Sequence, residues 1–183
     1  VLLVTPIIVL FLIFLPVIVP VLYTSEFKVI IPMLAFGILG MLFRAVSWSM
    51  GFILLAKGDS KVFIKTAIGF NSLQLTMNML SYVWYGLEGL GISFAIYFLI
   101  HFLGMKLITN KCYDFKLNKE FYRLFFICLL ISLLAFLVYH ISNVWVKYPI
   151  MVILVLISVT FTLKELHKKV DLKEYFHSKK LKK

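Results

Sequence analysis

Residues 29–56 read VIIPMLAFGILGMLFRAVSWSMGFILLA, an apolar stretch whose one charged residue is Arg44. A helix of about 20 apolar residues crosses the roughly 30 Å hydrocarbon core of a bilayer. This stretch is long enough to cross, and Arg44 then lies near the middle of the crossing. The sequence therefore predicts a transmembrane helix that carries a cation in its interior.

The composition of the 183 residues extends this pattern to the whole chain. Apolar residues make up 62% and charged residues 15%, and the mean hydropathy is +1.01. Soluble domains are about 45–50% apolar and about 25% charged, which excludes a soluble globule of this size. We predict an all-α, polytopic helical membrane protein with about six transmembrane helices, at residues 1–23, 29–56, 62–85, 89–108, 121–142 and 147–166.

The positive charges are distributed unevenly between the connections. All but three of the 19 Lys and Arg residues lie at positions 57–65, at positions 106–123, or from Lys164 to the end. Cytoplasmic connections retain Lys and Arg, so we expect both termini to be cytoplasmic. Residues 1–166 then form the transmembrane segment, and residues 167–183 form a basic cytoplasmic tail next to membrane lipids. This arrangement explains the excess of cations without nucleic acid as a partner.

Arg44 is the residue whose position most needs an explanation. It lies 13 residues before Lys57, which is about 20 Å from that end of the helix. Placing an arginine at this depth in the membrane costs from about 2.5 to more than 10 kcal/mol of free energy. Such a residue therefore normally faces a bundle interior or a water-filled cavity. No Asp or Glu lies between Glu26 and Asp59. Arg44 is therefore either a functional cavity cation or a structural hydrogen-bond anchor.

Small residues share a helical face with Arg44. Gly37, Gly40, Ser47 and Gly51 recur around it at three- and four-residue steps, which places them on one side of a helix. Small residues let neighbouring helices approach closely. The face is a packing seam, a cavity wall that widens at Arg44, or both at once.

A second polar face lies within residues 62–85. Asn71, Gln74 and Asn78 recur at three- and four-residue steps, so three amides share one side of a membrane helix. These amides either bond to neighbouring helices or form an aqueous wall for a hydroxyl-rich ligand. The predicted substrate-binding residues are Arg44, Ser47, Asn71, Gln74 and Asn78.

The other polar residues of the predicted helices suggest no further site. His101 follows Ser93 and Tyr97 at four-residue steps, and its nearness to Lys106 predicts an interfacial position. Residues 121–142 and 147–166 are rich in Leu, Ile, Val and Phe, and we expect both helices to be peripheral and lipid-facing.

Enzyme chemistry finds little support in the sequence. No carboxylate is predicted at membrane depth to act as a general base, and no His and carboxylate cluster has metal-ligand spacing. No Gly-rich loop leads to a Lys that would hold phosphate. We therefore predict a protein that is not an enzyme, with no catalytic residue, metal or cofactor.

The sequence resembles the distal half of the polysaccharide-repeat flippases, which belong to the multidrug, oligosaccharidyl-lipid and polysaccharide exporter superfamily. The resemblance covers nearly the whole chain and is most specific over residues 43–93. It is carried by FRAVSW at 43–48, ILLAKG at 53–58, YGLEGLGIS at 85–93, and Asn71 and Asn78 seven residues apart.

This resemblance implies the last six helices of a protein of about fourteen in a bacterial inner membrane. The chain, which begins at Val1, is expected to be a fragment that holds most of the C-terminal lobe and two accessory helices. Its partners would be the N-terminal lobe, membrane lipids and an undecaprenyl-pyrophosphate-linked oligosaccharide, with Arg44 as the contact of the anion. Two alternatives remain, a cation-coupled multidrug exporter of the same superfamily and a membrane-embedded glycosyl or acyl transferase, for which His101 and His140 are the candidate catalytic residues.

Overall fold

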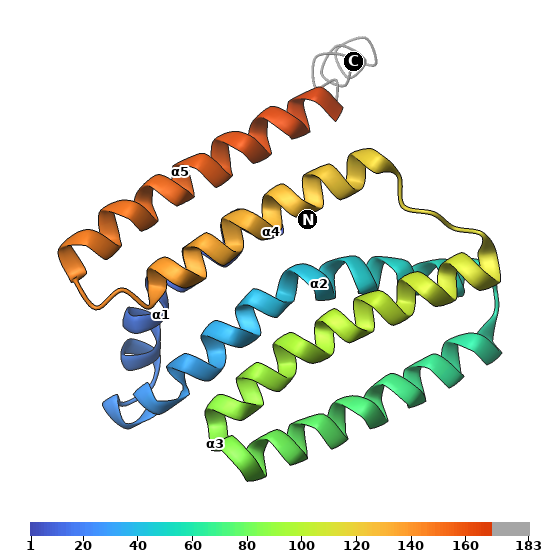
Figure 1. Ribbon diagram of the computed structural model, residues 1–183, viewed down its shortest axis with the longest axis horizontal. Coiled ribbons are helices and arrows are strands. Elements are labelled where there is room, and N and C mark those ends of the chain that lie inside the picture. Colours follow the sequence, from blue (N-terminus) through green and yellow to red (C-terminus); the bar gives the residue numbers. More distant parts are fainter. Residues whose placement is uncertain (170–183) are drawn as a thin grey trace, which may run out of the picture.

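The computed structural model describes residues 1–169, and these residues form helices with no strand among them. Successive helices run in opposite directions and lie side by side, so the connections gather at two opposite ends of a helical bundle (Figure 1). The elements are α1 (Val4–Leu22), a short 3₁₀ helix η1 (Ser25–Ile30), α2 (Ile31–Ala56), α3 (Ser60–Tyr113), α4 (Lys119–Tyr139) and α5 (Val144–Lys169).

Each of the five α-helices in the described part of the chain is long and apolar enough to cross a membrane. The all-helical prediction is confirmed, and the architecture is that of a multi-pass membrane protein. The observed helices begin and end within a few residues of the predicted ones, except that α3 covers two of them and α5 continues to Lys169. Most of the predicted basic tail, residues 170–183, lies outside the described residues.

Helix α3 is broken at Gly86, which divides its 54 residues into two arms. Gly86 has φ 61° and ψ −142°, a conformation that glycine adopts readily because it has no Cβ. The chain turns back at this residue, so residues 60–85 (the first arm) and 87–113 (the second arm) run antiparallel (Figure 1). The boundary between the predicted helices 62–85 and 89–108 lies at this turn.

Contacts along the whole hairpin hold the two arms together. Near the turn, the Ser93 hydroxyl donates a hydrogen bond to Oδ1 of Asn78, with 2.7 Å between the oxygens. At the open end, the Tyr113 hydroxyl donates to Oδ2 of Asp59 at 3.0 Å. Oδ1 of Asp59 also accepts a hydrogen bond from the backbone N–H of Val62 at 3.1 Å and caps the first arm. Asp59 therefore fixes both the start of α3 and the closure of its hairpin.

The core of the bundle surrounds α1. Ile8, Val9 and Leu12 are almost completely buried, and they belong to one cluster with Cys128 and Ala135 of α4. The prediction that residues 121–142 are peripheral is therefore wrong for one face of α4, because that face packs against α1 and α2. Helix α5 is more exposed, and many of its apolar side chains face outward.

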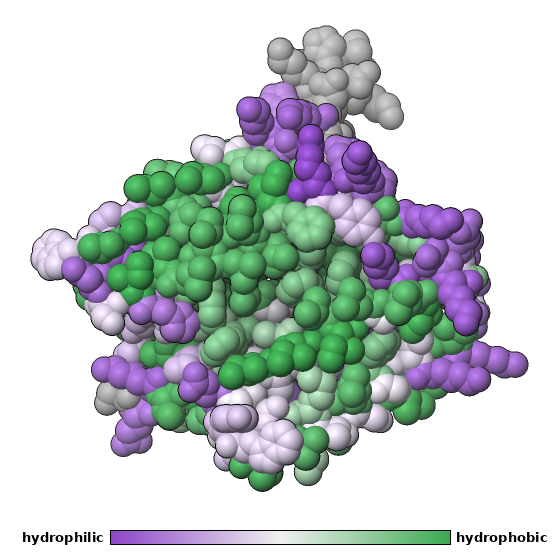
Figure 2. Space-filling view, viewed as in Figure 1, coloured by the Kyte–Doolittle hydropathy of each residue, from purple (hydrophilic) through white to green (hydrophobic). Residues whose placement is uncertain are grey.

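Charged residues gather at one end of the bundle. The connections 57–59 and 114–118 and the end of α5 lie together at this end, whereas Lys28 in η1 and Lys147 in the first turn of α5 lie at the other. Figure 2 shows hydrophobic residues over the middle of the drawn face and hydrophilic residues concentrated toward the cation-rich end. The charge asymmetry read from the sequence thus corresponds to the two ends of the bundle.

Candidate functional site

Close backbone contacts join α2 to the second arm of α3. A Cβ atom added at Gly91 would lie 2.6 Å from both Cα and O of Met33. One added at Gly40 would lie 2.8 Å from Phe98 and 3.1 Å from Cα of Ala95. These distances are shorter than the roughly 3.5–4.0 Å at which carbon atoms pack. At Gly91 the blocking atoms belong to the main chain, so an added Cβ does not fit, whereas at Gly40 the closest atom belongs to the side chain of Phe98. Gly37 of the same predicted face has no neighbour within 4 Å of an added Cβ.

A cavity of about 380 Å³ lies between α2 and the two arms of α3, beyond the contact at Gly40. The small-residue face of α2 is thus a packing seam at Gly40 and a cavity wall from Arg44 to Gly51. The lining residues are Arg44, Ser47, Trp48, Gly51, Phe52, Leu54 and Leu55 from α2, Phe63, Thr66, Ala67, Phe70, Asn71 and Gln74 from the first arm, and Tyr97, Phe98, His101 and Met105 from the second arm.

Arg44 lies at the centre of α2, about 19 Å from either end of that helix. Its guanidinium carbon lies 4.4 Å from the ring centre of Trp48 and 5.2 Å from that of Phe98. Each cation–π contact contributes from about 0.5 to about 2 kcal/mol, the larger value applying where water is excluded. Two such contacts offset part of the cost of placing the cation there, but they do not neutralise its charge.

The guanidinium has no anionic partner among residues 1–169. No carboxylate of this part of the chain lies within 4 Å of it, and the cavity lining contains no Asp or Glu. Within residues 1–169, every completely buried side-chain nitrogen or oxygen has a hydrogen-bond partner. The donors of Arg44 are therefore not sealed in the protein, and Arg44 is part of the cavity lining.

The structure brings four of the five predicted site residues together. Arg44, Ser47, Asn71 and Gln74 all line the cavity. Ser47 is completely buried, and its hydroxyl donates to the backbone oxygen of Arg44 at 3.0 Å. Asn78 is not part of the lining, and its side chain accepts the hydrogen bond from Ser93 instead. Of the two roles proposed for the amides, Asn78 therefore has the interhelical one.

Several cavity residues were not among the predicted site residues. His101 was expected at the interface, but it lines the cavity with its ring centre 4.5 Å from that of Phe70 and 5.7 Å from that of Tyr97. Trp48 also lines the cavity. The four-residue spacing of Ser93, Tyr97 and His101 was the one signal in the sequence that these side chains share a face.

A second, apolar groove lies between α1 and α2. Its volume is about 680 Å³. All lining residues are apolar or aromatic except Arg44, which lines both cavities together with Trp48. The lining comprises Val4, Ile7, Ile8, Phe11, Leu15, Ile18, Val19 and Tyr23 of α1 and Leu34, Ile38, Met41, Arg44, Ala45 and Trp48 of α2.

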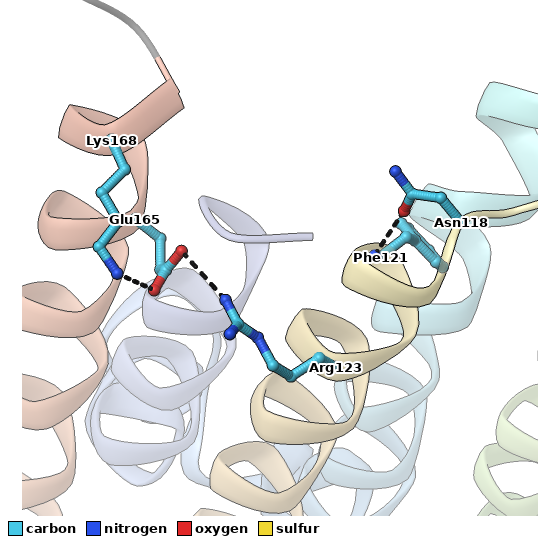
Figure 3. A network of polar contacts seen from close by, with 5 residues as sticks. All are labelled: Asn118, Phe121, Arg123, Glu165 and Lys168. Carbon is cyan, nitrogen blue, oxygen red and sulfur yellow. Dashed lines mark hydrogen bonds and ion pairs between the residues drawn. The ribbon is translucent and has the colours of Figure 1, made fainter.

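The largely buried carboxylate of Glu165 lies away from both cavities, at the cation-rich end. Its Oε1 lies 3.2 Å from Nζ of Lys168 and its Oε2 lies 3.9 Å from the guanidinium of Arg123, so the network ties α5 to α4 (Figure 3). Nearby, the N-terminus of α4 is capped, since the N–H of Phe121 donates to Oδ1 of Asn118 at 2.7 Å. Within residues 1–169, no group of His, Cys, Asp and Glu side chains is arranged to hold a metal ion.

No protein-family model, no curated protein and no solved structure matches this chain.

Proposed function

We propose that the chain is part of a transporter that moves lipid-linked oligosaccharide repeat units from the inner to the outer leaflet of a bacterial inner membrane, for polysaccharide biosynthesis. In this proposal each arm of α3 crosses the membrane. The helices then make six crossings, and the cation-rich end of the bundle, with both termini, faces the cytoplasm. The protein is a transporter and not an enzyme.

The observation that carries the proposal is the setting of Arg44. A cation in the middle of a membrane helix, in the wall of a cavity and with no carboxylate partner among residues 1–169, is suited to an anion that arrives as a ligand. Guanidinium groups bind phosphate oxygens in a bidentate manner. The anion we assign to Arg44 is the pyrophosphate of an undecaprenyl-pyrophosphate-linked oligosaccharide.

The amides beside Arg44 complete the proposed site. Asn71 and Gln74 of the first arm line the same cavity and provide both donors and acceptors. Sugar hydroxyl groups need both kinds of partner, whereas an apolar drug needs neither. Ser47 is completely buried and its hydroxyl proton is engaged by the backbone of Arg44, so it forms part of the cavity wall beside Arg44 and offers no free donor. Asn78 holds the two arms of α3 together in this proposal and does not touch substrate.

The resemblance to polysaccharide-repeat flippases supports the same function and supplies the rest of the assembly. It implies that this segment forms most of a C-terminal lobe with two accessory helices. The N-terminal lobe of the same protein then closes the central path, and membrane lipids surround the whole. Transport is assigned to the complete protein.

The experiment that tests the proposal locates the lipid-linked repeat unit in cells that lack the full-length gene. A membrane-impermeant glycan label detects repeat units on the outer leaflet. We expect them to accumulate on the cytoplasmic side, and we expect the wild-type gene to restore outer-leaflet delivery. Arg44→Ala should not restore it at a normal protein level, whereas Arg44→Lys should restore part of it because the charge is kept.

Lys57→Gln is the matched control, because Lys57 caps the same helix but lies outside the cavity. We expect delivery in this variant to equal that of the wild type. Normal delivery in the deletion strain, in the absence of a second flippase, would refute the proposal. Normal delivery by Arg44→Ala would remove Arg44 from the transport path.

A further inference from the structure

Two cavities that differ in polarity meet at Arg44. The cavity between α2 and α3 carries the polar groups of Ser47, Asn71 and Gln74, whereas the groove between α1 and α2 is apolar. Arg44 and Trp48 are the residues that the two linings share. A molecule that occupied both spaces would therefore have a polar end, an apolar end and, between them, a group that suits a cation.

The dimensions of the groove restrict what fits in it. Along α2 its lining extends from Leu34 to Trp48, which is roughly 21 Å at 1.5 Å per residue. Arg44 lies toward one end, so about 15 Å of apolar wall continues from it to Leu34. Hydrogen-bonding ligands are disfavoured there, because the walls leave their polar groups without partners. A hydrocarbon chain has no such groups and fits the groove lengthwise.

We propose that this α1–α2 groove holds the polyprenyl chain of the substrate, while the phosphate attached to that chain binds Arg44. The attached sugar then lies in the neighbouring cavity between α2 and α3, beside Asn71 and Gln74. The assignment rests on the proposed function for the identity of the substrate. Its own support is charge complementarity at Arg44, where the apolar groove ends and the polar cavity begins. A single groove against one helix pair also favours a lipid with one chain over a diacyl lipid.

Helix α1 offers a matched pair of positions for testing this proposal. Phe11 lines the groove and is 48% exposed, whereas Phe14 lies on the same helix outside the groove and is 50% exposed. Each is replaced in turn with the photoreactive analogue benzoylphenylalanine in the full-length protein. The proteins are reconstituted in phosphatidylcholine vesicles that contain a radiolabelled polyprenyl phosphate, and cross-linking is measured against lipid concentration.

We expect saturable labelling at position 11 and only weak, non-saturable labelling at position 14. Arg44→Gln should lower the labelling at position 11 about tenfold, since a lost charge-assisted contact weakens binding by at least that factor. Excess phosphatidylglycerol should compete poorly. Equal labelling at the two positions, labelling that does not depend on Arg44, or complete competition by phosphatidylglycerol would each overturn the assignment.

A second pair of variants tests the groove without the photoreactive group. Ile7 lines the groove and Val17 does not, although both side chains are 51% exposed on α1. Ile7→Trp should abolish saturable binding of polyprenyl phosphate, and Val17→Trp should preserve it. Retained binding in Ile7→Trp would refute the groove. These assays measure binding and not transport. If polyprenyl phosphate binds in the groove but the protein delivers no repeat unit, the transport proposal is refuted and the assignment of the groove stands.

Discussion

Replacing Gly91 with alanine tests whether α2 and the second arm of α3 pack backbone against backbone. The new Cβ atom would lie 2.6 Å from Cα and O of Met33, about 1 Å closer than carbon atoms pack. Both of these neighbours belong to the main chain, so no change of rotamer relieves the contact. The helices have to separate, and such overpacking costs about 1–3 kcal/mol.

Glycines of α2 provide graded comparisons for this variant. At Gly40 the closest neighbour, at 2.8 Å, is the ring of Phe98, which can rotate, although Cα of Ala95 at 3.1 Å cannot. At Gly37 no atom lies within 4 Å. Alanine is favoured over glycine in a helix by roughly 0.5–1 kcal/mol, so the exchange at Gly37 should be neutral or stabilising.

The assay is thermal unfolding of the purified full-length protein, followed by the loss of monodisperse protein on size-exclusion chromatography. We expect the unfolding temperature to fall most for Gly91→Ala, to fall less for Gly40→Ala and to stay the same or rise for Gly37→Ala. A decrease at Gly37 equal to that at Gly91 would show that replacing any of these glycines lowers the stability, and that the contact with Met33 is not the cause. An unchanged unfolding temperature for Gly91→Ala would refute the close contact with Met33.

Two further variants test the α3 hairpin by the same assay. Gly86→Ala should lower the free energy of unfolding by about 1–3 kcal/mol, because Gly86 holds a positive φ that alanine adopts only under strain. The control is Gly69→Ala, at a helical position with open space around it. Equal losses of stability in the two variants would refute the reasoning. Asp59→Ala and Tyr113→Phe both remove the hydrogen bond that closes the hairpin, but only Asp59→Ala also removes the N-cap of α3. Asp59→Ala should therefore lower the free energy of unfolding by about 1 kcal/mol more than Tyr113→Phe does. Equal losses would contradict a separate role for the cap.

The helices were predictable because their length and apolar composition are local properties. A bilayer requires about 20 apolar residues per crossing, and the sequence supplies such stretches between polar connections. The break at Gly86 was predictable on the same ground, because glycines cluster where the apolar pattern is interrupted. The partial burial of α4 was not predictable, because its Leu, Ile, Val and Phe side chains suit lipid and protein equally well.

For the site, the sequence predicts which side chains share a face of one helix, but not which side chains of different helices meet. Helical spacing placed Asn71, Gln74 and Asn78 on one face, but it does not say what each amide meets. That depends on the antiparallel register of the second arm, which places Ser93 opposite Asn78 and His101 opposite Phe70. The register is set by the turn at Gly86 and by packing between residues far apart in sequence. The same reason explains why His101 was predicted at the interface when it lines the cavity.

The two sides of α2 differ in how closely their neighbours approach, and this difference bears on how a ligand enters. On the α3 side, Gly91 leaves no room for a side-chain atom between the backbones of α2 and the second arm, and Gly40 leaves little. On the α1 side, bulky apolar side chains surround an open groove. In the proposed binding mode, an apolar chain therefore reaches Arg44 along this open groove without separation of α2 from α3. Substitutions that fill the α1 side should accordingly affect lipid binding at little cost in stability, whereas those at the glycine contacts should do the reverse.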